Sequence, residues 1–109
     1  CISRKTQTYI RGLTVDRPSA KPTVLIENDR TIVTEWSFSV GAETGWHRHG
    51  YDYVVVPVVD GELLIEEGEG QSRVVELKTG EPYFRETGVE HNVVNNNPFD
   101  FRFIEVEYK

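Results

Sequence analysis

The chain consists of short stretches rich in β-branched and aromatic residues, and this sequence pattern constrains its fold more than any other feature. Turn residues separate the stretches at intervals of about eight to twelve residues, and no segment has a convincing helical period. The expected strands are residues 23–27, 31–40, 53–59, 62–67, 73–77, 83–85, 89–95 and 99–108. About eight short strands predict an all-β sandwich or closed antiparallel barrel.

The length of the chain favours a single domain, because 109 residues can bury one hydrophobic core. Residues 1–22 contain Pro18 and Pro22 and show little periodicity, so we expect an arm or a pair of edge strands there. Residues 23–109 are expected to form one barrel. No apolar run approaches the ~20 residues that a membrane-spanning helix needs, so no membrane span is expected.

Two local patterns predict how particular strands behave. Asp60-Gly61 lies between two apolar pairs, and both residues tolerate the positive φ of a type I′ turn, so a tight hairpin is predicted there. Phenylalanine occupies every second position from 99 to 103, and apolar residues occupy the alternate positions from 104 to 108. The last strand is therefore apolar on both faces, unless a β-bulge near Phe103 resets its phase.

A surplus apolar surface predicts a homodimer. Residues 54–56 are all valine, so the strand that contains them is also apolar on both faces. The second face of such a strand must be covered by another sheet or by a partner subunit. In so small a chain, two strands of this kind favour a second copy as the cover.

Charge and cysteine content exclude several classes of partner and site. The net charge is -6, from 18 acidic and 12 basic residues, which argues against nucleic acid or an anionic membrane surface as the main partner. Cys1 is the one cysteine, which excludes an internal disulfide and a cysteine-based zinc site. Because the chain begins at Cys1 and lacks methionine, we expect a trimmed cytoplasmic protein, with a bacterial lipoprotein anchored through Cys1 as the alternative.

The three histidines are placed where they can converge. His47 and His49 are two residues apart, so their imidazoles project to the same side of an extended segment, and His91 follows shortly after Gly88. Three neutral imidazoles would bind one divalent transition metal (Fe, Mn, Ni, Zn or Cu) and leave positions open to water or a small-molecule substrate. The alternative is that His47 and His49 are solvated and that His91 is a hydrogen-bonded core residue.

The spacing of glycines and histidines resembles the two motifs of the cupin family. Matching positions are Gly41, His47, His49 and Gly61 in G-x5-H-x-H-x4-E-x6-G, and Gly80, Gly88, His91 and Asn95 in G-x5-P-x-G-x2-H-x3-N. The resemblance spans residues 41–95, and it implies a jelly-roll β-barrel with the three histidines as metal ligands. The segments 46–57, 83–85 and 88–92 more closely resemble the small bacterial cupins of β-alanine degradation.

The chain departs from the first motif at its glutamate ligand. Val54 occupies that position, or Tyr53 if the spacing is one residue shorter, and Glu86 replaces the proline of the second motif. The resemblance therefore implies a three-histidine site, as in the cupin thiol dioxygenases and the diketone-cleaving cupins. Loss of a carboxylate raises the charge of the site and frees a coordination position, which favours an anionic or chelating substrate.

Other acidic residues could supply a carboxylate near the metal. Asp52 could orient a histidine N–H from outside the coordination sphere. Glu35, Glu105 and Glu107 belong to strands that could line the cavity, but strand parity alone leaves their direction open.

Tyrosine and arginine side chains are the candidates for substrate chemistry. Tyr53 and Tyr83 could be catalytic, because a phenol near a metal can donate a hydrogen bond or a proton. Arg85 or Arg102 could bind a substrate carboxylate with two parallel hydrogen bonds. For each of the four, an ordinary strand tyrosine or a surface salt bridge is the alternative.

Three further residues receive structural or mixed interpretations. Trp46, with Trp36, could form an aromatic wall of the ligand pocket, although core packing is the more common role of such residues. Arg48 falls between the two ligand histidines and is expected on the opposite face. Asn95 is expected to stabilise neighbouring backbone.

The sequence therefore predicts an all-β, antiparallel jelly-roll cupin that binds one divalent metal through three histidines. The resemblance implies a metal-dependent enzyme acting on a small carboxylate or oxo-acid, by dioxygenase-like cleavage or by lyase or isomerase chemistry. A non-catalytic module that binds a metal or a small ligand is the alternative from another class, and a barrel that has lost its metal is a third.

Overall fold

A computed structural model describes residues 7–10 and 13–109. In the described part of the chain every element is a strand and none is a helix. The strands are β1 (Gln7–Ile10), β2 (Leu13–Asp16), β3 (Lys21–Glu27), β4 (Thr31–Phe38), β5 (His47–Arg48), β6 (Asp52–Pro57), β7 (Gly61–Glu66), β8 (Ser72–Leu77), β9 (Tyr83–Arg85), β10 (Glu90–Asn95) and β11 (Phe101–Tyr108). No helix in these residues is long and apolar enough to cross a membrane.

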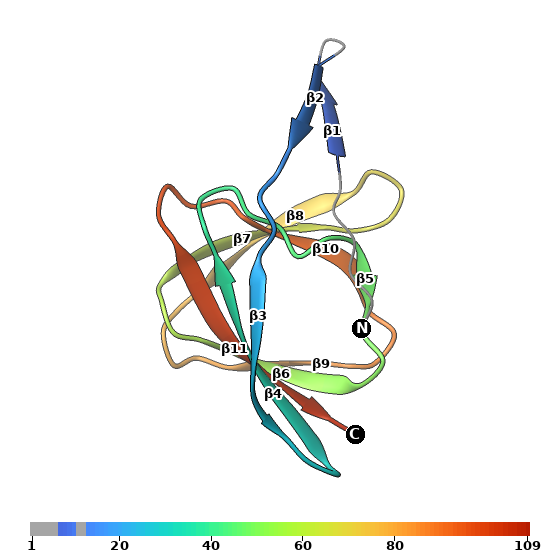
Figure 1. Ribbon diagram of the computed structural model, residues 1–109, viewed down its shortest axis with the longest axis vertical. Coiled ribbons are helices and arrows are strands. Elements are labelled where there is room, and N and C mark those ends of the chain that lie inside the picture. Colours follow the sequence, from blue (N-terminus) through green and yellow to red (C-terminus); the bar gives the residue numbers. More distant parts are fainter. Residues whose placement is uncertain (1–6, 11–12) are drawn as a thin grey trace.

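Two antiparallel sheets form the barrel (Figure 1). One has the order β3-β4-β11-β6-β9 and the other the order β5-β10-β7-β8. Their inner faces enclose a core to which the first sheet contributes Phe38, Phe101 and Phe103, and the second contributes Leu63 and Ile65. The predicted all-β, antiparallel jelly-roll architecture is confirmed. Burial alternates along the strands, so each sheet has one inner face that packs into the core.

The N-terminal segment forms a hairpin that projects from the barrel (Figure 1). Strands β1 and β2 pair with each other, and β3 then joins the edge of the five-stranded sheet. Strand β3 begins at Lys21, slightly before the expected start of the barrel. The division at residue 22 stays a prediction, and the interpretation of Cys1 lies outside the described residues.

The hairpin predicted at Asp60-Gly61 is wrong. Strands β6 and β7 belong to different sheets, so residues 58–60 cross from one sheet to the other, and neither residue of the pair has a positive φ. Asp60 instead accepts a hydrogen bond from the Thr79 N–H at 2.7 Å. Glycine is needed at position 61 for space, because a Cβ there would lie 2.8 Å from Oδ1 of Asn97.

The bulge near Phe103, which was the alternative to a two-sided strand, is absent from β11. Its register against β4 runs without a shift from Phe101 to Tyr108. Phe101, Phe103, Glu105 and Glu107 are buried on the inner face, and the alternate residues face outward. The strand is therefore two-sided, and its inner face changes from aromatic to acidic along its length.

Candidate metal centre

Two short segments position the three histidines. His47 lies in β5 directly opposite His91 in β10, because the antiparallel register pairs these two residues. His49 follows β5, and its backbone N–H donates to the carbonyl of Val89 at 2.9 Å while its own carbonyl accepts from Gly88 at 2.8 Å. Gly88 has a φ of 93°, a conformation that favours glycine and that reverses the chain just before β10.

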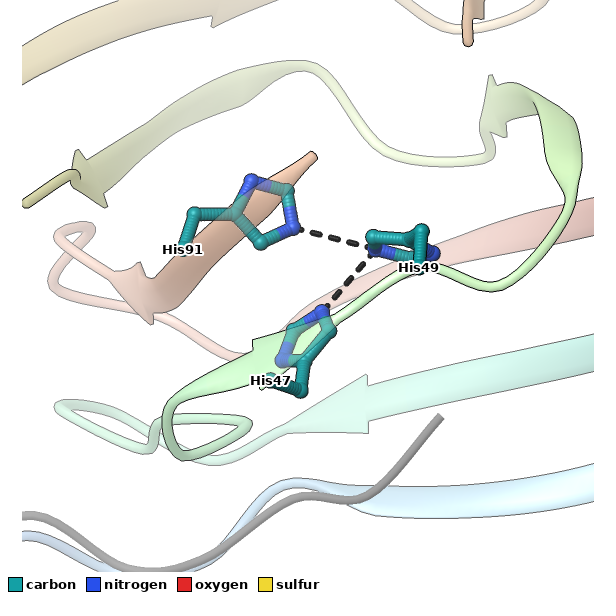
Figure 2. A group of neighbouring side chains, drawn as sticks. All are labelled: His47, His49 and His91. Atoms are coloured by element: carbon teal, nitrogen blue, oxygen red, sulfur yellow. Dashed lines mark hydrogen bonds between the residues drawn. The ribbon is translucent and has the colours of Figure 1, made fainter. Parts of the chain in front are cut away.

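The three imidazoles point their Nε2 atoms at one another (Figure 2). The Nε2 atoms of His47 and His49 are 2.9 Å apart, and those of His49 and His91 are 3.1 Å apart. All three side chains are buried, and the exposed Arg48 lies between the first two.

These separations fit a metal ion bound by all three rings. The ligand nitrogens of His47, His49 and His91 all lie within 4.8 Å of one another, so the three rings could hold one ion between them. Three protein ligands leave coordination positions for water or a substrate.

The protonation of the rings suits them as metal ligands. Nδ1 of His47 lies 2.8 Å from the carbonyl oxygen of Gly45, which can only accept, so the ring proton is on Nδ1 and Nε2 presents a lone pair. Burial lowers the pKa of His47, and burial with repulsion from neighbouring charges lowers the pKa of His49 to about 3 and of His91 to about 2. All three rings are therefore neutral at neutral pH, which is the form of histidine that binds a metal ion.

A polar network supports the Gly45 segment that accepts the hydrogen bond of His47, and no local sequence pattern indicated it. The amide of Asn92 accepts from the Gly45 N–H at 2.9 Å and donates to Glu43 and Glu66 at 2.8 Å each. Arg17 donates to the same two carboxylates, at 3.2 Å to Glu43 and 2.8 Å to Glu66.

A cavity of about 310 Å³ opens beside the histidines. Of the residues proposed to act on substrate, Tyr53, Tyr83 and Arg85 line it, together with Arg73. Most of the wall is apolar, and its buried or partly buried apolar and aromatic members include Trp36, Val55, Leu63, Ile65, Val75, Val93 and Phe103.

Two candidate residues do not reach the cavity. Arg102 projects from the outer face of β11, where its half-exposed side chain lies 3.8 Å from Glu35. Trp46 is partly buried but is not part of the cavity wall, whereas Trp36 is. Strand parity explains Arg102, because the inner positions of β11 are the odd-numbered ones.

Tyr53, rather than Val54, occupies the inward position that corresponds to the glutamate of the motif. Tyr53 is 2% exposed, and its ring stacks on His49 with 3.9 Å between centroids. Val54 faces outward and pairs with Phe84 and Val106 of the neighbouring strands. The shorter spacing is therefore the correct alignment. Burial raises the pKa values of Tyr53 and Tyr83, so both phenols keep their protons at neutral pH.

The candidate carboxylates lie in different parts of the structure. Asp52 accepts from the Thr87 N–H at 2.8 Å and so stabilises the turn before β10 rather than orienting a histidine. Glu35 lies on the outer face with Arg102. Glu105 and Glu107 are buried on the inner face of β11, and their carboxylate oxygens lie within 4.8 Å of each other and of a ring nitrogen of His49.

The sequence is similar to a known family and to a named bacterial protein. A family model described as a cupin domain matches residues 34–107. The β-alanine degradation protein BauB of Pseudomonas aeruginosa PAO1 is 56% identical over 93 residues, which cover 85% of this chain and 97% of that protein.

Solved structures of bacterial proteins have a similar fold. A cupin domain from Bordetella pertussis Tohama I has a TM-score of 0.84 and 54% identity, and the match covers 87% of this chain and 98% of that one. A conserved protein with a double-stranded β-helix domain from Klebsiella pneumoniae has a TM-score of 0.68 and 25% identity, and the match covers 83% of this chain and 76% of that one.

Proposed function

Since this chain belongs to the cupin domain family, we propose that it is a metal-dependent enzyme acting on a small carboxylate or oxo-acid. The observation that supports this most is the convergence of three buried Nε2 atoms on one point at the wall of a cavity. His47, His49 and His91 would hold the ion. Imidazole nitrogens suit Fe, Mn, Ni, Zn and Cu, so each of these divalent ions is a candidate.

The cavity provides groups for an anionic substrate. A bound divalent ion would act as a Lewis acid that polarises a substrate oxygen. Arg85 lines the same cavity and can bind a carboxylate with two parallel hydrogen bonds. Tyr53 and Tyr83 are protonated phenols, so each can donate a hydrogen bond or a proton to a substrate oxygen. The apolar walls exclude water and strengthen each of these polar interactions.

The relative named as a β-alanine degradation protein supports a substrate from that part of metabolism. Three-carbon carboxylates derived from β-alanine are small enough for a cavity of about 310 Å³. These compounds are therefore the first substrates to test, in aerobic and in anaerobic assays that separate oxygen-dependent cleavage from lyase or isomerase chemistry.

Metal analysis tests the proposal directly. Protein purified without a histidine tag should contain close to one divalent metal ion per chain by plasma mass spectrometry. His91→Ala should lose that metal, whereas Arg48→Ala, which changes the exposed residue between two ligands, should keep it. Equal metal content in His91→Ala and the wild type would refute the site.

A non-catalytic binding module is the second candidate function. It shares the metal site and the cavity and differs only in lacking turnover. If protein loaded in turn with Fe, Mn, Ni, Zn and Cu binds small carboxylates and converts none of them, the binding module replaces the enzyme.

We also propose that the protein is a homodimer that packs through the outer face of its five-stranded sheet. One apolar residue from each strand lies in a continuous row across this face: Ile26, Val33, Val106, Val54 and Phe84. Ile26 and Phe84, at the two ends of the row, are each 54% exposed. A row of this kind is typical of a face covered by a second copy.

Sedimentation equilibrium tests the dimer. The wild type should have twice the 12.5 kDa mass of one chain at micromolar concentration. Ile26→Glu should shift the mass towards one chain, whereas Val74→Glu, at an exposed position of the other sheet, should not. A wild-type mass of one chain would refute the dimer.

A further inference from the structure

A pair of buried glutamates beside the metal centre has no role in the function proposed above. Glu105 and Glu107 are each 7% exposed, and they follow Phe101 and Phe103 on the inner face of β11. Their carboxylate oxygens lie within 4.8 Å of each other. Glu105 lines the cavity.

No cation of the described residues compensates this pair. Neither glutamate forms an ion pair with any residue that the structure describes. Burial and repulsion from Glu107 raise the pKa of Glu105 to about 7, and the indole of Trp36 opposes the rise by donating a hydrogen bond. Two buried carboxylates so close together favour the arrival of a cation, because burial of an unpaired charge is costly.

An unpartnered hydroxyl lies in the same cavity. The hydroxyl of Tyr53 is buried and lacks a hydrogen-bond partner among the described residues, and its oxygen can accept from an ammonium group. The Tyr53 side chain is 2% exposed and lines the cavity. The charges of Glu105 and Glu107 both act on Tyr53, which places the phenol close to the acidic pair. Buried polar groups of this kind are usually satisfied by a ligand or by water.

The cavity also has a basic part. Arg85 and Arg73 line it, and the charge of Arg85 acts on His49, His91 and Tyr83. Neither arginine forms an ion pair with Glu105 or Glu107. One cavity therefore offers two carboxylates and two guanidinium groups that are not paired with each other.

We propose that the cavity binds an amino acid in its zwitterionic form, with the ammonium group held by Glu105 and Glu107 and the carboxylate held on the side of Arg85. This proposal rests on the proposed function and extends it by naming the substrate class. A primary ammonium carries three donors, and the two carboxylates offer several acceptor positions for them.

A second metal ion fits the acidic pair less well than an ammonium group. When Nε2 of His49 binds the first ion as a neutral imidazole, its proton is on Nδ1, which is then a donor and cannot bind a cation. Only the two carboxylates remain as anionic ligands, and divalent ions need more oxygen ligands than these provide. Hydrogen bonds from an ammonium group need no further ligand.

Calorimetric titration of the metal-loaded protein tests the proposal with three probes of similar size: β-alanine, propanoate and propylamine. β-Alanine should bind at least tenfold more tightly than either of the others. Glu105→Gln removes one acidic group while keeping the shape of the side chain. It should reduce the affinity for β-alanine to that for propanoate and leave the affinity for propanoate unchanged or higher.

Glu35→Gln, at an outward position of the same sheet, is the matched control and should bind all three probes as the wild type does. The proposal is overturned if propanoate and β-alanine bind equally to the wild type, or if Glu105→Gln affects both equally. It is also overturned if the wild type binds two metal ions per chain and Glu105→Gln binds one. Metal content measured on the same samples separates these outcomes from failure of the three-histidine site itself.

Discussion

Two pairs of glutamates lie near the histidines, and the protein compensates their charges in opposite ways. Behind His47, Glu43 and Glu66 share Arg17 and Asn92 as partners. Beside His49, Glu105 and Glu107 share the inner face of β11 with no cationic partner in the described structure. The charges of the first pair are matched within the protein, whereas those of the second pair are matched by no described residue, which is why we propose that a ligand matches them.

This difference separates two roles of a glutamate side chain: a carboxylate can support the metal site, or it can bind a ligand. A carboxylate that supports the site has its charge matched by the protein, so it stabilises the fold. A carboxylate that recognises a ligand is left unmatched, so it destabilises the fold until the ligand binds. The two pairs should therefore respond in opposite directions to mutation and to pH.

The largest effect is expected at Arg17. Arg17→Ala leaves the fully buried Glu43 without its cation and should lower the free energy of unfolding by about 3 kcal/mol in urea. The hydrogen bond from Arg17 lowers the pKa of Glu66, so this contribution is present above the ordinary glutamate pKa and is lost as the pH falls below it. Arg48→Ala, at an exposed arginine, should change the stability little, and equal losses in the two variants would contradict the assignment.

An effect of the opposite sign is expected at Glu105. The pKa of its carboxyl is raised from 4.5 to about 7, so the stability that its protonated form supports is complete below pH 4.5 and lost as the pH rises through 7. Glu105→Gln removes this loss. In chelator-treated protein it should exceed the wild type in stability by an amount that grows from pH 4.5 to pH 7 and then levels off, on the order of 3 kcal/mol. A variant less stable than the wild type at pH 8 would contradict an unmatched carboxylate.

A smaller effect, on metal affinity, is expected at Asn92. Asn92→Ala removes the amide that holds the Gly45 N–H, while the carbonyl of Gly45 still accepts from His47. Metal affinity in a competition assay with a coloured chelator should fall about tenfold, the lower end of the range for such supporting groups. Asn96→Ala is the matched control, since Asn96 is exposed and contacts only the side chain of Glu62 among the hydrogen bonds described.

The smallest effect is expected for the ion pair of Arg102 and Glu35, which is not buried and does not face the cavity. Arg102 and Glu35 lie 3.8 Å apart on the outer face of the barrel. Arg102→Ala should change the stability by less than about 0.5 kcal/mol, because exposed pairs are screened by water. Thermal unfolding in low and high salt gives the comparison, and a loss as large as that of Arg17→Ala would show that burial is not what separates the pairs.

Period-two patterns in the sequence predicted most strand positions and the three-histidine cluster, because alternation and short-range spacing are local properties. They failed where a longer-range choice decided the outcome. Asp60-Gly61 has the composition of a hairpin, but the chain changes sheets there, and only contacts such as that of Gly61 with Asn97 reveal why. Tyr53 could be recognised over Val54 only when the inward phase of β6 was known.

The inward direction of the Glu105 side chain could have been predicted from the sequence. Once Phe101 and Phe103 are placed in the core, an unbroken strand must also turn Glu105 inward and Arg102 outward, and only the possibility of a bulge left the question open. No comparable signal exists for Arg17, Glu43 and Asn92. Their contacts join residues 26 and 49 positions apart, and such pairings depend on the assembled barrel.

Alternation along β6 and β11 has a consequence for how such a protein can change over time. Odd-numbered residues of β11 face the interior of the barrel, and even-numbered residues face outward towards the proposed second copy. A substitution on one face therefore leaves the chemistry of the other face intact. Descendants of this barrel can acquire a new ligand without losing their assembly, or a new assembly without losing their ligand, so the two traits are free to evolve independently.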